Sequence, residues 1–135
     1  MRQIKFRGQR TDTKEWVYGY YLKATASQLG EDIPLASARI CHCIIQDGIK
    51  FYVIPESVGQ FTGLLDKQGK EIYEGDIVTF DRNDRLSFIL WSQSWCGFAM
   101  YEHQDKLGMK LNMFVNMDKF EIIGNIHENK ELMEE

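Results

Sequence analysis

The chain has no apolar run near the ~20 residues that a membrane-spanning helix requires. Its start, MRQIKFRGQR, also lacks the apolar stretch of a secretory signal peptide. These absences predict a soluble, cytoplasmic protein. The 135 residues, 44% of them hydrophobic, are enough for one domain with a buried core.

Cysteine is scarce, with Cys41, Cys43 and Cys96 as the three thiols. An odd number in a chain without an export signal argues against a disulfide framework, so we expect free thiols. On a strand, Cys41 and Cys43 point to one face and His42 points to the other. Because free cysteine packs as a small hydrophobic side chain, we interpret that face as buried.

The chain also lacks a set of side chains with the spacing of a metal site. Structural zinc needs four nitrogen or sulfur donors around one ion. No CxxC pair is present, and a CxC pair within one strand cannot easily hold a single ion. We therefore predict no metal and no cofactor. The side chains considered as donors are Cys41, His42, Cys43, Cys96, His103 and His127.

No catalytic motif stands out either. Cys96 has a loop-like setting, but its neighbour Trp95 supplies neither the histidine nor the positive charge that activates a thiolate. Glu71, Glu74 and Asp76 cluster in one turn, where carboxylates seldom face each other across a cleft. We predict that the protein is not an enzyme. A small enzyme that uses Cys96 or the acids from Glu71 to Asp76 is an alternative.

The net charge of −4 disfavours nonspecific binding of a phosphate backbone by the surface as a whole. Arg2, Lys5, Arg7 and Arg10 nevertheless have no acidic neighbour within the first ten residues, and the tail from residue 128 to 135 contains four glutamates and one lysine. We interpret both ends as solvated surfaces. A contact between oppositely charged ends of two subunits, or a small basic patch, is the alternative.

Aromatic residues make up 13% of the chain. Stacking platforms for single-stranded nucleic acid combine exposed aromatic and basic side chains. One region offers that mixture, and its candidate nucleic-acid-binding residues are Arg7, Arg10, Lys14, Trp16 and Tyr18. Packing in the core or in a subunit interface is the favoured interpretation, since aromatic residues on strands usually bury their area.

Short stretches with alternating or β-branched and aromatic side chains predict strands throughout the chain. In Ile4–Arg7 the apolar side chains should face the core and the basic ones the solvent. Asp47-Gly48 favours a type I′ turn between two further strands. The predicted strands are 4–7, 16–22, 40–45, 49–54, 77–80, 86–91, a strand within 91–101, and 120–127. Short helical turns are expected at 55–57 and 128–133, and loops with some helical turn at 23–38 and 106–115.

The stretch VGQFTGLLDKQGKEIYEGDIVTF, from Val58 to Phe80, combines two tight turns with alternating apolar positions. We expect Gly69 and Gly75 to adopt positive φ and Asp76 to accept hydrogen bonds from the backbone of its turn. The whole pattern predicts a mainly β fold, a compact SH3-like or irregular β-barrel built from hairpins with short helical turns. Residues 1–135 should form one domain, with an N-terminal hairpin lobe at 1–57 and a C-terminal barrel lobe at 58–127.

This central stretch, with IKFRGQRTDTKEWVYG near the start and FEIIGNIHENKELM near the end, resembles the YopX family of phage and prophage proteins. The resemblance follows the chain in order from one end to the other. It implies a small protein of a phage or prophage genome, and it carries no catalytic residues with it. We expect a non-enzymatic domain that forms homo-oligomers or binds a host or phage protein. A nucleic-acid accessory protein that uses the N-terminal basic and aromatic hairpin is the alternative.

Overall fold

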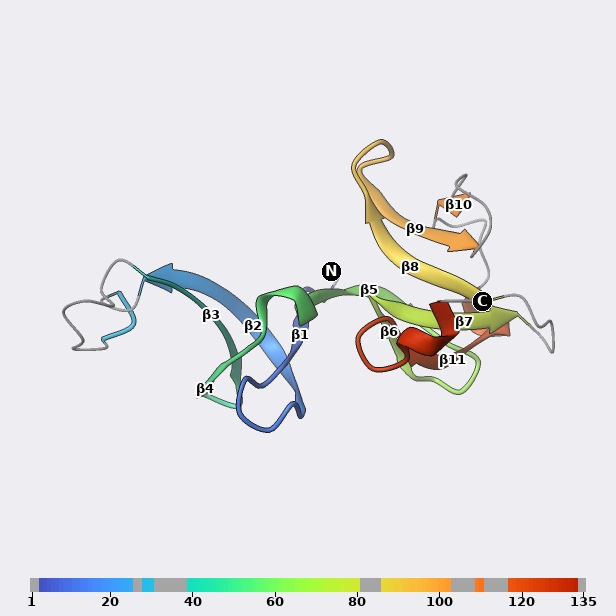
Figure 1. The fold of residues 1–135 in the computed structure, drawn as a ribbon. Helices are drawn as coiled ribbons and strands as arrows, with labels where there is room; N and C mark the ends of the chain where they lie inside the picture. Colours follow the sequence, from blue (N-terminus) through green and yellow to red (C-terminus); the bar gives the residue numbers. More distant parts are fainter. Residues whose placement is uncertain are drawn as a thin grey trace. The chain divides into compact units, whose positions relative to one another are not determined.

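The computed structural model describes residues 3–25, 28–30, 39–80, 86–102, 109–110 and 117–133. The chain divides into two compact units. Residues 4–60 form the N-terminal unit, and residues 61–135 with 1–3 form the C-terminal unit. Figure 1 labels their strands, and each unit is described separately below. The subdivision expected at residues 1–57 and 58–127 stays a prediction.

The N-terminal unit is an antiparallel sheet in the order β4-β3-β2-β1-β5. A 3-10 turn, η2, connects β4 to β5. The first two residues of β5 pair with β1, and its later residues belong to the C-terminal unit. The elements are β1 (Phe6–Gln9), β2 (Trp16–Thr25), β3 (Ile40–Gln46), β4 (Ile49–Tyr52), η2 (Pro55–Ser57) and β5 (Gly59–Leu65).

The turn between β3 and β4 confirms the predicted hairpin. Asp47 has φ 52° and Gly48 has φ 79°, which are the two positive values of a type I′ turn. Gln46 and Ile49 pair directly across the turn. The right-handed twist of such a turn matches that of its strands, so the hairpin needs no longer loop.

One face of this sheet carries the core of the N-terminal unit. Val17, Ile44 and Val53 are buried there. The partly buried side chains packed against them are Phe6, Tyr21, Phe51 and Val58. At Gly19 the carbonyl oxygen of Ile45 occupies the space that a Cβ would need, so β2 and β3 could not approach in this way with a larger residue.

The expectation for the first strand was wrong in its detail. Ile4 is exposed and precedes β1, whereas Arg7, expected on the solvent side, is only 6% exposed. Alternation correctly separates the faces of the strand, but it does not say whether the second face is also covered. In this strand the second face is covered by an aromatic ring.

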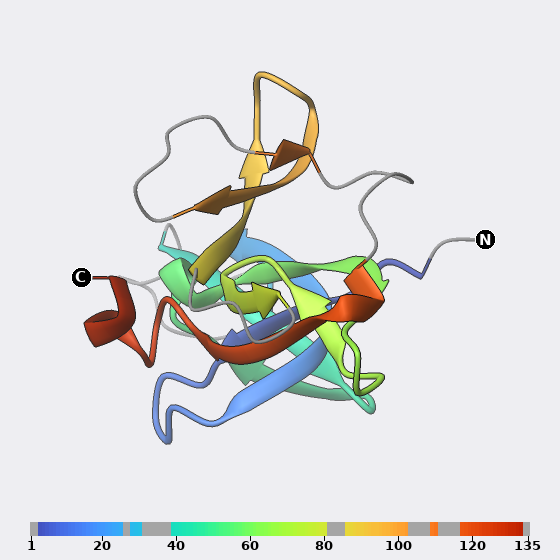
Figure 2. The ribbon, with the colours of Figure 1, turned by 90° about the vertical axis from the view of Figure 1, so that its right-hand side faces the viewer.

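The C-terminal unit contains an antiparallel sheet in the order β10-β9-β8-β7-β11 and the ladder of β5 with β6. Its core consists of Ile72, Val78, Ile89 and Met100. Figure 2 shows the β8–β9 hairpin extending beyond the other strands of this unit. The elements are β6 (Glu71–Tyr73), β7 (Asp76–Phe80), β8 (Leu86–Ser92), β9 (Gly97–Glu102), β10 (Met109–Lys110), η3 (Met117–Lys119), β11 (Phe120–Asn125) and η4 (Lys130–Met133).

The mainly β prediction is confirmed, with two antiparallel sheets and short 3-10 turns. Among the described residues the strands do not close into a barrel, since β10 and β11 lie at opposite edges of one sheet. SH3-like connectivity stays a prediction. Within 106–115, where a loop was expected, β10 pairs with β9. Most of the expected 23–38 loop lies outside the described residues, and β2 reaches Thr25.

Asp66 connects the turn after β5 to the last strand of the C-terminal unit. Its buried carboxylate accepts hydrogen bonds from the backbone N–H groups of Gln68 at 2.9 Å and Lys70 at 2.8 Å. Its second oxygen accepts one from the N–H of Ile122 in β11 at 3.2 Å. The N–H of Lys67 donates to the carbonyl of Phe120 at 2.8 Å. The outer edge of β11 is therefore bonded to this turn.

Gly75 connects two other parts of the same unit. It has φ 95°, the positive value that its sequence context suggests. Its N–H donates to the carbonyl of Ile89 at 2.6 Å, and its carbonyl accepts from the N–H of Ile126 at 2.9 Å. The backbone conformation at Gly75 thus aligns β8 and the end of β11 with the bend before β7. No helix among the described residues is long and apolar enough to cross a membrane.

We predict that Gly75→Val lowers the free energy of unfolding by more than about 1 kcal/mol, because a β-branched residue resists positive φ. Gly69→Val is the comparison, since Gly69 also has positive φ and no atom lies within 4 Å of the place that a Cβ would take, so its loss measures the backbone strain alone. Urea and thermal unfolding of both variants measure the difference. A melting temperature of Gly75→Val within about a degree of the parent would contradict the prediction.

Asp66→Ala should lower the free energy of unfolding by about 2–4 kcal/mol, because three backbone donors lose a charged acceptor in a buried place. Asp66→Asn keeps an acceptor oxygen and should cost less. Glu121→Ala is the matched control, since it removes exposed contacts with Lys67 and Gln68. Equal losses for Asp66→Ala and Glu121→Ala in urea unfolding would refute the role given to Asp66.

Candidate functional site

Arg7 and Trp16 lie in β1 and β2, which pair with each other. The guanidinium carbon of Arg7 is 4.5 Å from the centroid of the Trp16 ring. This cation–π contact, together with the burial of Arg7, places the positive charge inside the N-terminal unit. A buried guanidinium of this kind supports the packing of the sheet more directly than it supports a contact with phosphate.

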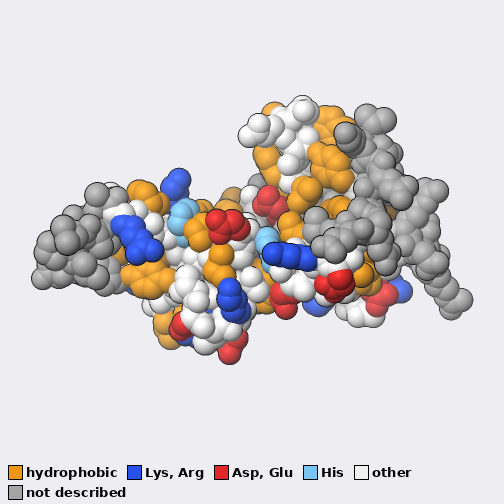
Figure 3. Space-filling model, viewed as in Figure 1, with side chains coloured by type: hydrophobic (Ala, Val, Ile, Leu, Met, Phe, Trp, Pro, Cys, Tyr) orange, Lys and Arg blue, Asp and Glu red, His pale blue; other side chains and the backbone are white. Residues whose placement is uncertain are grey.

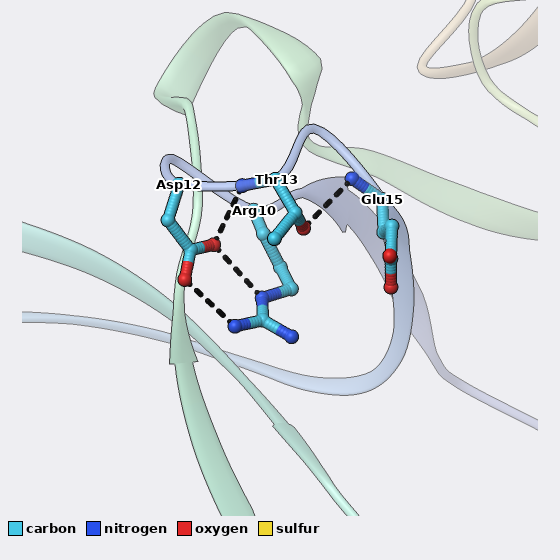
Figure 4. A network of polar contacts seen from close by, with 4 residues as sticks. All are labelled: Arg10, Asp12, Thr13 and Glu15. Atoms are coloured by element: carbon cyan, nitrogen blue, oxygen red, sulfur yellow. Dashed lines mark hydrogen bonds and ion pairs between the residues drawn. The ribbon is translucent and has the colours of Figure 1, made fainter.

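Arg10 is held in an ion pair with Asp12 in the β1–β2 loop, as Figure 4 shows. Its Nε and Nη2 donate to the two carboxylate oxygens of Asp12 at 3.0 and 2.7 Å. The hydrogen bond from Arg10 lowers the pKa of Asp12, and the same bond raises the pKa of Arg10. Thr13 completes the loop, donating its N–H to Asp12 and accepting the N–H of Glu15.

Lys14 is exposed in this loop, with φ 66°. Tyr18 is also exposed, and it pairs with Arg7 across β1 and β2. The five candidate nucleic-acid-binding residues therefore lie in one hairpin, but they present little free positive charge together. Arg7 is buried and Arg10 is balanced by Asp12. Nucleic-acid binding by this set stays a prediction, and its electrostatic basis is weaker than the sequence suggests.

The face of the N-terminal sheet opposite its core carries several exposed apolar side chains. Tyr18, Tyr20 and Leu22 alternate along β2 and so point to the same side. Tyr52 of β4 joins them, because Cys43 of β3 pairs with both Leu22 and Tyr52. Their exposed fractions are 41%, 74%, 40% and 36% in the order Tyr18, Tyr20, Leu22 and Tyr52. We call these four residues the tyrosine face.

Lys50 is an additional basic residue in contact with the tyrosine face. Its Nζ lies 5.0 Å from the centroid of the Tyr52 ring. Cys43 lies fully buried between the strands that carry the tyrosine face. Figure 3 shows hydrophobic side chains at the surface beside lysine and arginine residues. Large apolar side chains gathered on one face are a feature of surfaces that bind other proteins.

Sequence reasoning singled out Tyr18 and missed Tyr20, Leu22 and Tyr52. The stretch from Trp16 to Leu22 is apolar at both alternating sets of positions, so polarity does not reveal which set faces the core. Gly19 is the available signal. It lies on the side opposite Tyr18 and Tyr20, where the close approach of Ile45 requires glycine.

The three cysteines are free. Register places Cys41 and Cys43 on the side of β3 that carries the tyrosine face, so the expectation of a buried face holds for Cys43 itself but is wrong for the face as a whole. His42 lies on the other side of β3, where its Nδ1 lies 2.5 Å from the hydroxyl of Tyr21. Burial raises the pKa of Tyr21. No group of three potential metal ligands occurs among the described residues. His103 lies outside them, and His127 donates its N–H to Asn125 at 3.0 Å.

The residues of the enzymatic alternative lie on different elements, and each has local contacts. Cys96 is exposed in the β8–β9 turn with φ 51°, and its Sγ is 3.5 Å from the carbonyl oxygen of Gln93. Glu71 accepts a hydrogen bond from the hydroxyl of Tyr73 at 3.1 Å. Asp76 is buried and accepts the N–H of Tyr73 at 2.7 Å. These hydrogen bonds indicate that Glu71 and Asp76 stabilise the turn in which they lie.

Comparison with known proteins identifies a family and a similar solved structure. A family model described as YopX protein matches residues 5–134. The crystal structure of protein EF1440 from Enterococcus faecalis is similar, with a TM-score of 0.58 and 25% identity over 99% of this chain and 100% of that chain. No curated protein matches.

We predict that the purified protein contains no stoichiometric zinc after dialysis against a chelator, because the thiols lie at packing positions or in a turn. Elemental analysis measures the zinc content. Cys41→Ser and Cys43→Ser should also leave that content unchanged. Zinc that survives dialysis in the parent and is lost in either variant would overturn this interpretation.

Proposed function

This chain belongs to the YopX family, and from that premise we propose that it is a non-enzymatic protein-binding domain that self-associates. The match covers nearly the whole chain, so the proposed function is assigned to residues 5–134 together. The single observation that carries the proposal is the tyrosine face. A phage or prophage origin and a cytoplasmic location belong to the same proposal, supported by the family resemblance and the odd number of cysteines.

The tyrosine face supports protein binding because of its composition. Tyrosine offers a large contact area at a low cost in side-chain entropy, and it is enriched where proteins meet. Tyr20 is the central candidate for an anchor, since it is the most exposed large apolar residue of the chain's described part. An exposed ring in this position loses contact with water when another surface covers it, which is favourable.

The first binding partner that we propose for the tyrosine face is a second copy of the chain. The tyrosine face lies at the end of the sheet where β4 is the edge strand, and edge strands favour association when they are not covered. Cytoplasmic proteins of the host or the phage are further partners for an adaptor. These proteins would bind the same face in place of a second copy.

A nucleic-acid accessory function is the second candidate, and one observation favours it. The tyrosine face combines exposed rings with Lys50, which is the combination used to stack single-stranded nucleic acid. The negative charge of the whole chain and the ion pair at Arg10 weigh against it. A salt-dependent mobility shift with single-stranded DNA or RNA that Tyr20→Ser abolishes would favour this second function.

Tyr20→Ser should weaken self-association at least about tenfold, because anchors at interfaces commonly contribute about 2 kcal/mol or more. Sedimentation velocity over a range of concentrations measures the dissociation constant. Ile49→Ser is the matched control, since Ile49 is 58% exposed in β4 but alternates to the opposite side from Tyr52. Association of Tyr20→Ser that equals the parent, or a parent that is monomeric at high micromolar concentration, would reject the proposal.

A further inference from the structure

The turn of the β8–β9 hairpin carries the second group of exposed aromatic side chains. Trp91 is 47% exposed and Trp95 is 38% exposed. Trp91 packs edge-on against Phe98, with ring centroids 5.3 Å apart. Ser92 pairs with Gly97 at the end of the ladder, so residues 93–96 form the turn. We call Trp91, Trp95 and this turn the tryptophan tip.

The turn itself is well defined. The hydroxyl of Ser92 accepts the N–H of Trp95 at 3.3 Å, and the carbonyl of Gln93 accepts the N–H of Cys96 at 3.3 Å. Figure 1 shows the hairpin extending beyond the other strands of the C-terminal unit. The two indole rings are thus presented by a short turn with its own hydrogen bonds. A ring held by an ordered turn loses little conformational entropy when a partner buries it.

The hairpin carries no charged side chain before its last residue, Glu102. Between Leu86 and Tyr101 the sequence contains no Asp, Glu, Lys, Arg or His, in a chain that is 27% charged. A surface without charge loses no ionic hydration when it is covered. Charged residues are depleted, and tryptophan is enriched, at the centres of protein interfaces. The tryptophan tip therefore has the composition of an interface centre.

Charge decides which class of partner suits this tip. The C-terminal unit, residues 1–3 and 61–135, contains nine Lys and Arg against fourteen Asp and Glu. A unit with this balance is repelled by anionic lipid surfaces and by nucleic acid. Residues 4–60 contain seven Lys and Arg against six Asp and Glu, and Lys50 contacts the tyrosine face. Contact of the C-terminal unit of one copy with the N-terminal unit of another is therefore favoured over contact between two acidic C-terminal units.

We propose that the tryptophan tip of one copy docks on the tyrosine face of a second copy. This inference rests on the proposed function, and it names the surface that covers the tyrosine face. Trp95 would pack against Tyr20 and Leu22, and the uncharged turn would let Lys50 keep its contact with Tyr52. Such a contact joins two different surfaces, so assembly continues from copy to copy and closes into a ring or extends as a chain.

Mixing two variants of the full chain tests this docking. Trp95→Ser removes the tip anchor, and Tyr20→Ser removes the face anchor. Each variant alone should associate at least about tenfold more weakly than the parent. Their mixture should form a 1:1 dimer with nearly the parent dissociation constant, because each pair retains one intact tip and one intact face. Sedimentation velocity with one fluorescently labelled variant detects that dimer.

Two matched controls separate loss of docking from loss of folding. Ile123→Ser changes an apolar side chain of the C-terminal unit that is 40% exposed, and Ile49→Ser does the same in the N-terminal unit. Both should associate as the parent does. Ser94→Lys is a second tip variant that removes no apolar side chain and places a charge in the docked contact. It should weaken association while its melting temperature stays that of the parent.

The outcomes distinguish this inference from the proposed function. If Trp95→Ser and Ser94→Lys associate like the parent while Tyr20→Ser does not, the tip does not cover the face and the docking is wrong. Self-association through the tyrosine face would then stand. Absence of a dimer in the mixture of two folded variants would also overturn the docking. Normal association of Tyr20→Ser would overturn both.

Discussion

The hydrogen bonds of Asp66 are the constraint on which the C-terminal unit depends. One carboxylate closes its own turn through Gln68 and Lys70 and also holds the N–H of Ile122, which is 56 residues further along the chain. A buried carboxylate is stable when several donors surround it, and here the donors are backbone groups of two separate segments. The turn and β11 therefore stabilise each other. The same bonds protect the outer edge of β11 from pairing with another chain.

Because its outer edge is bonded to this turn, β11 is a poor site for pairing with a second chain. An exposed sheet edge is a general site of uncontrolled pairing, and in the C-terminal unit the turn after β5 bonds to the edge that β11 would otherwise present. Among the described residues, the exposed aromatic side chains lie on the tyrosine face and the tryptophan tip. Side chains give a more specific contact than backbone edges do, since their shape and chemistry vary. A protein that assembles through side chains can control its partners better than one that pairs strands.

The sequence predicts those features that depend on neighbouring residues. Asp47-Gly48 adopts two positive φ values because the preference lies in these residues themselves, and Cys41 and Cys43 share a face because strands alternate. The partner of Asp66 in β11 and the pairing of β10 with β9 depend on distant segments, so local patterns do not reveal them. For the candidate site, Tyr18 was identified without Tyr20, Leu22 and Tyr52. Both faces of β2 are apolar, and alternation alone does not tell which is covered.

The contacts that Arg7 and Arg10 make within the N-terminal unit explain why we propose protein binding before nucleic-acid binding. Arg7 is placed against Trp16, and Arg10 is bonded to Asp12 while its guanidinium also lies 4.8 Å from the Phe51 ring. These two cations stabilise the sheet and its loop, so they contribute little to an attractive field for phosphate. The exposed rings that remain are tyrosines and tryptophans, whose contacts gain free energy chiefly by excluding water. An interface built on these rings should depend more on shape than on salt, as burial of apolar surface is not screened by ions.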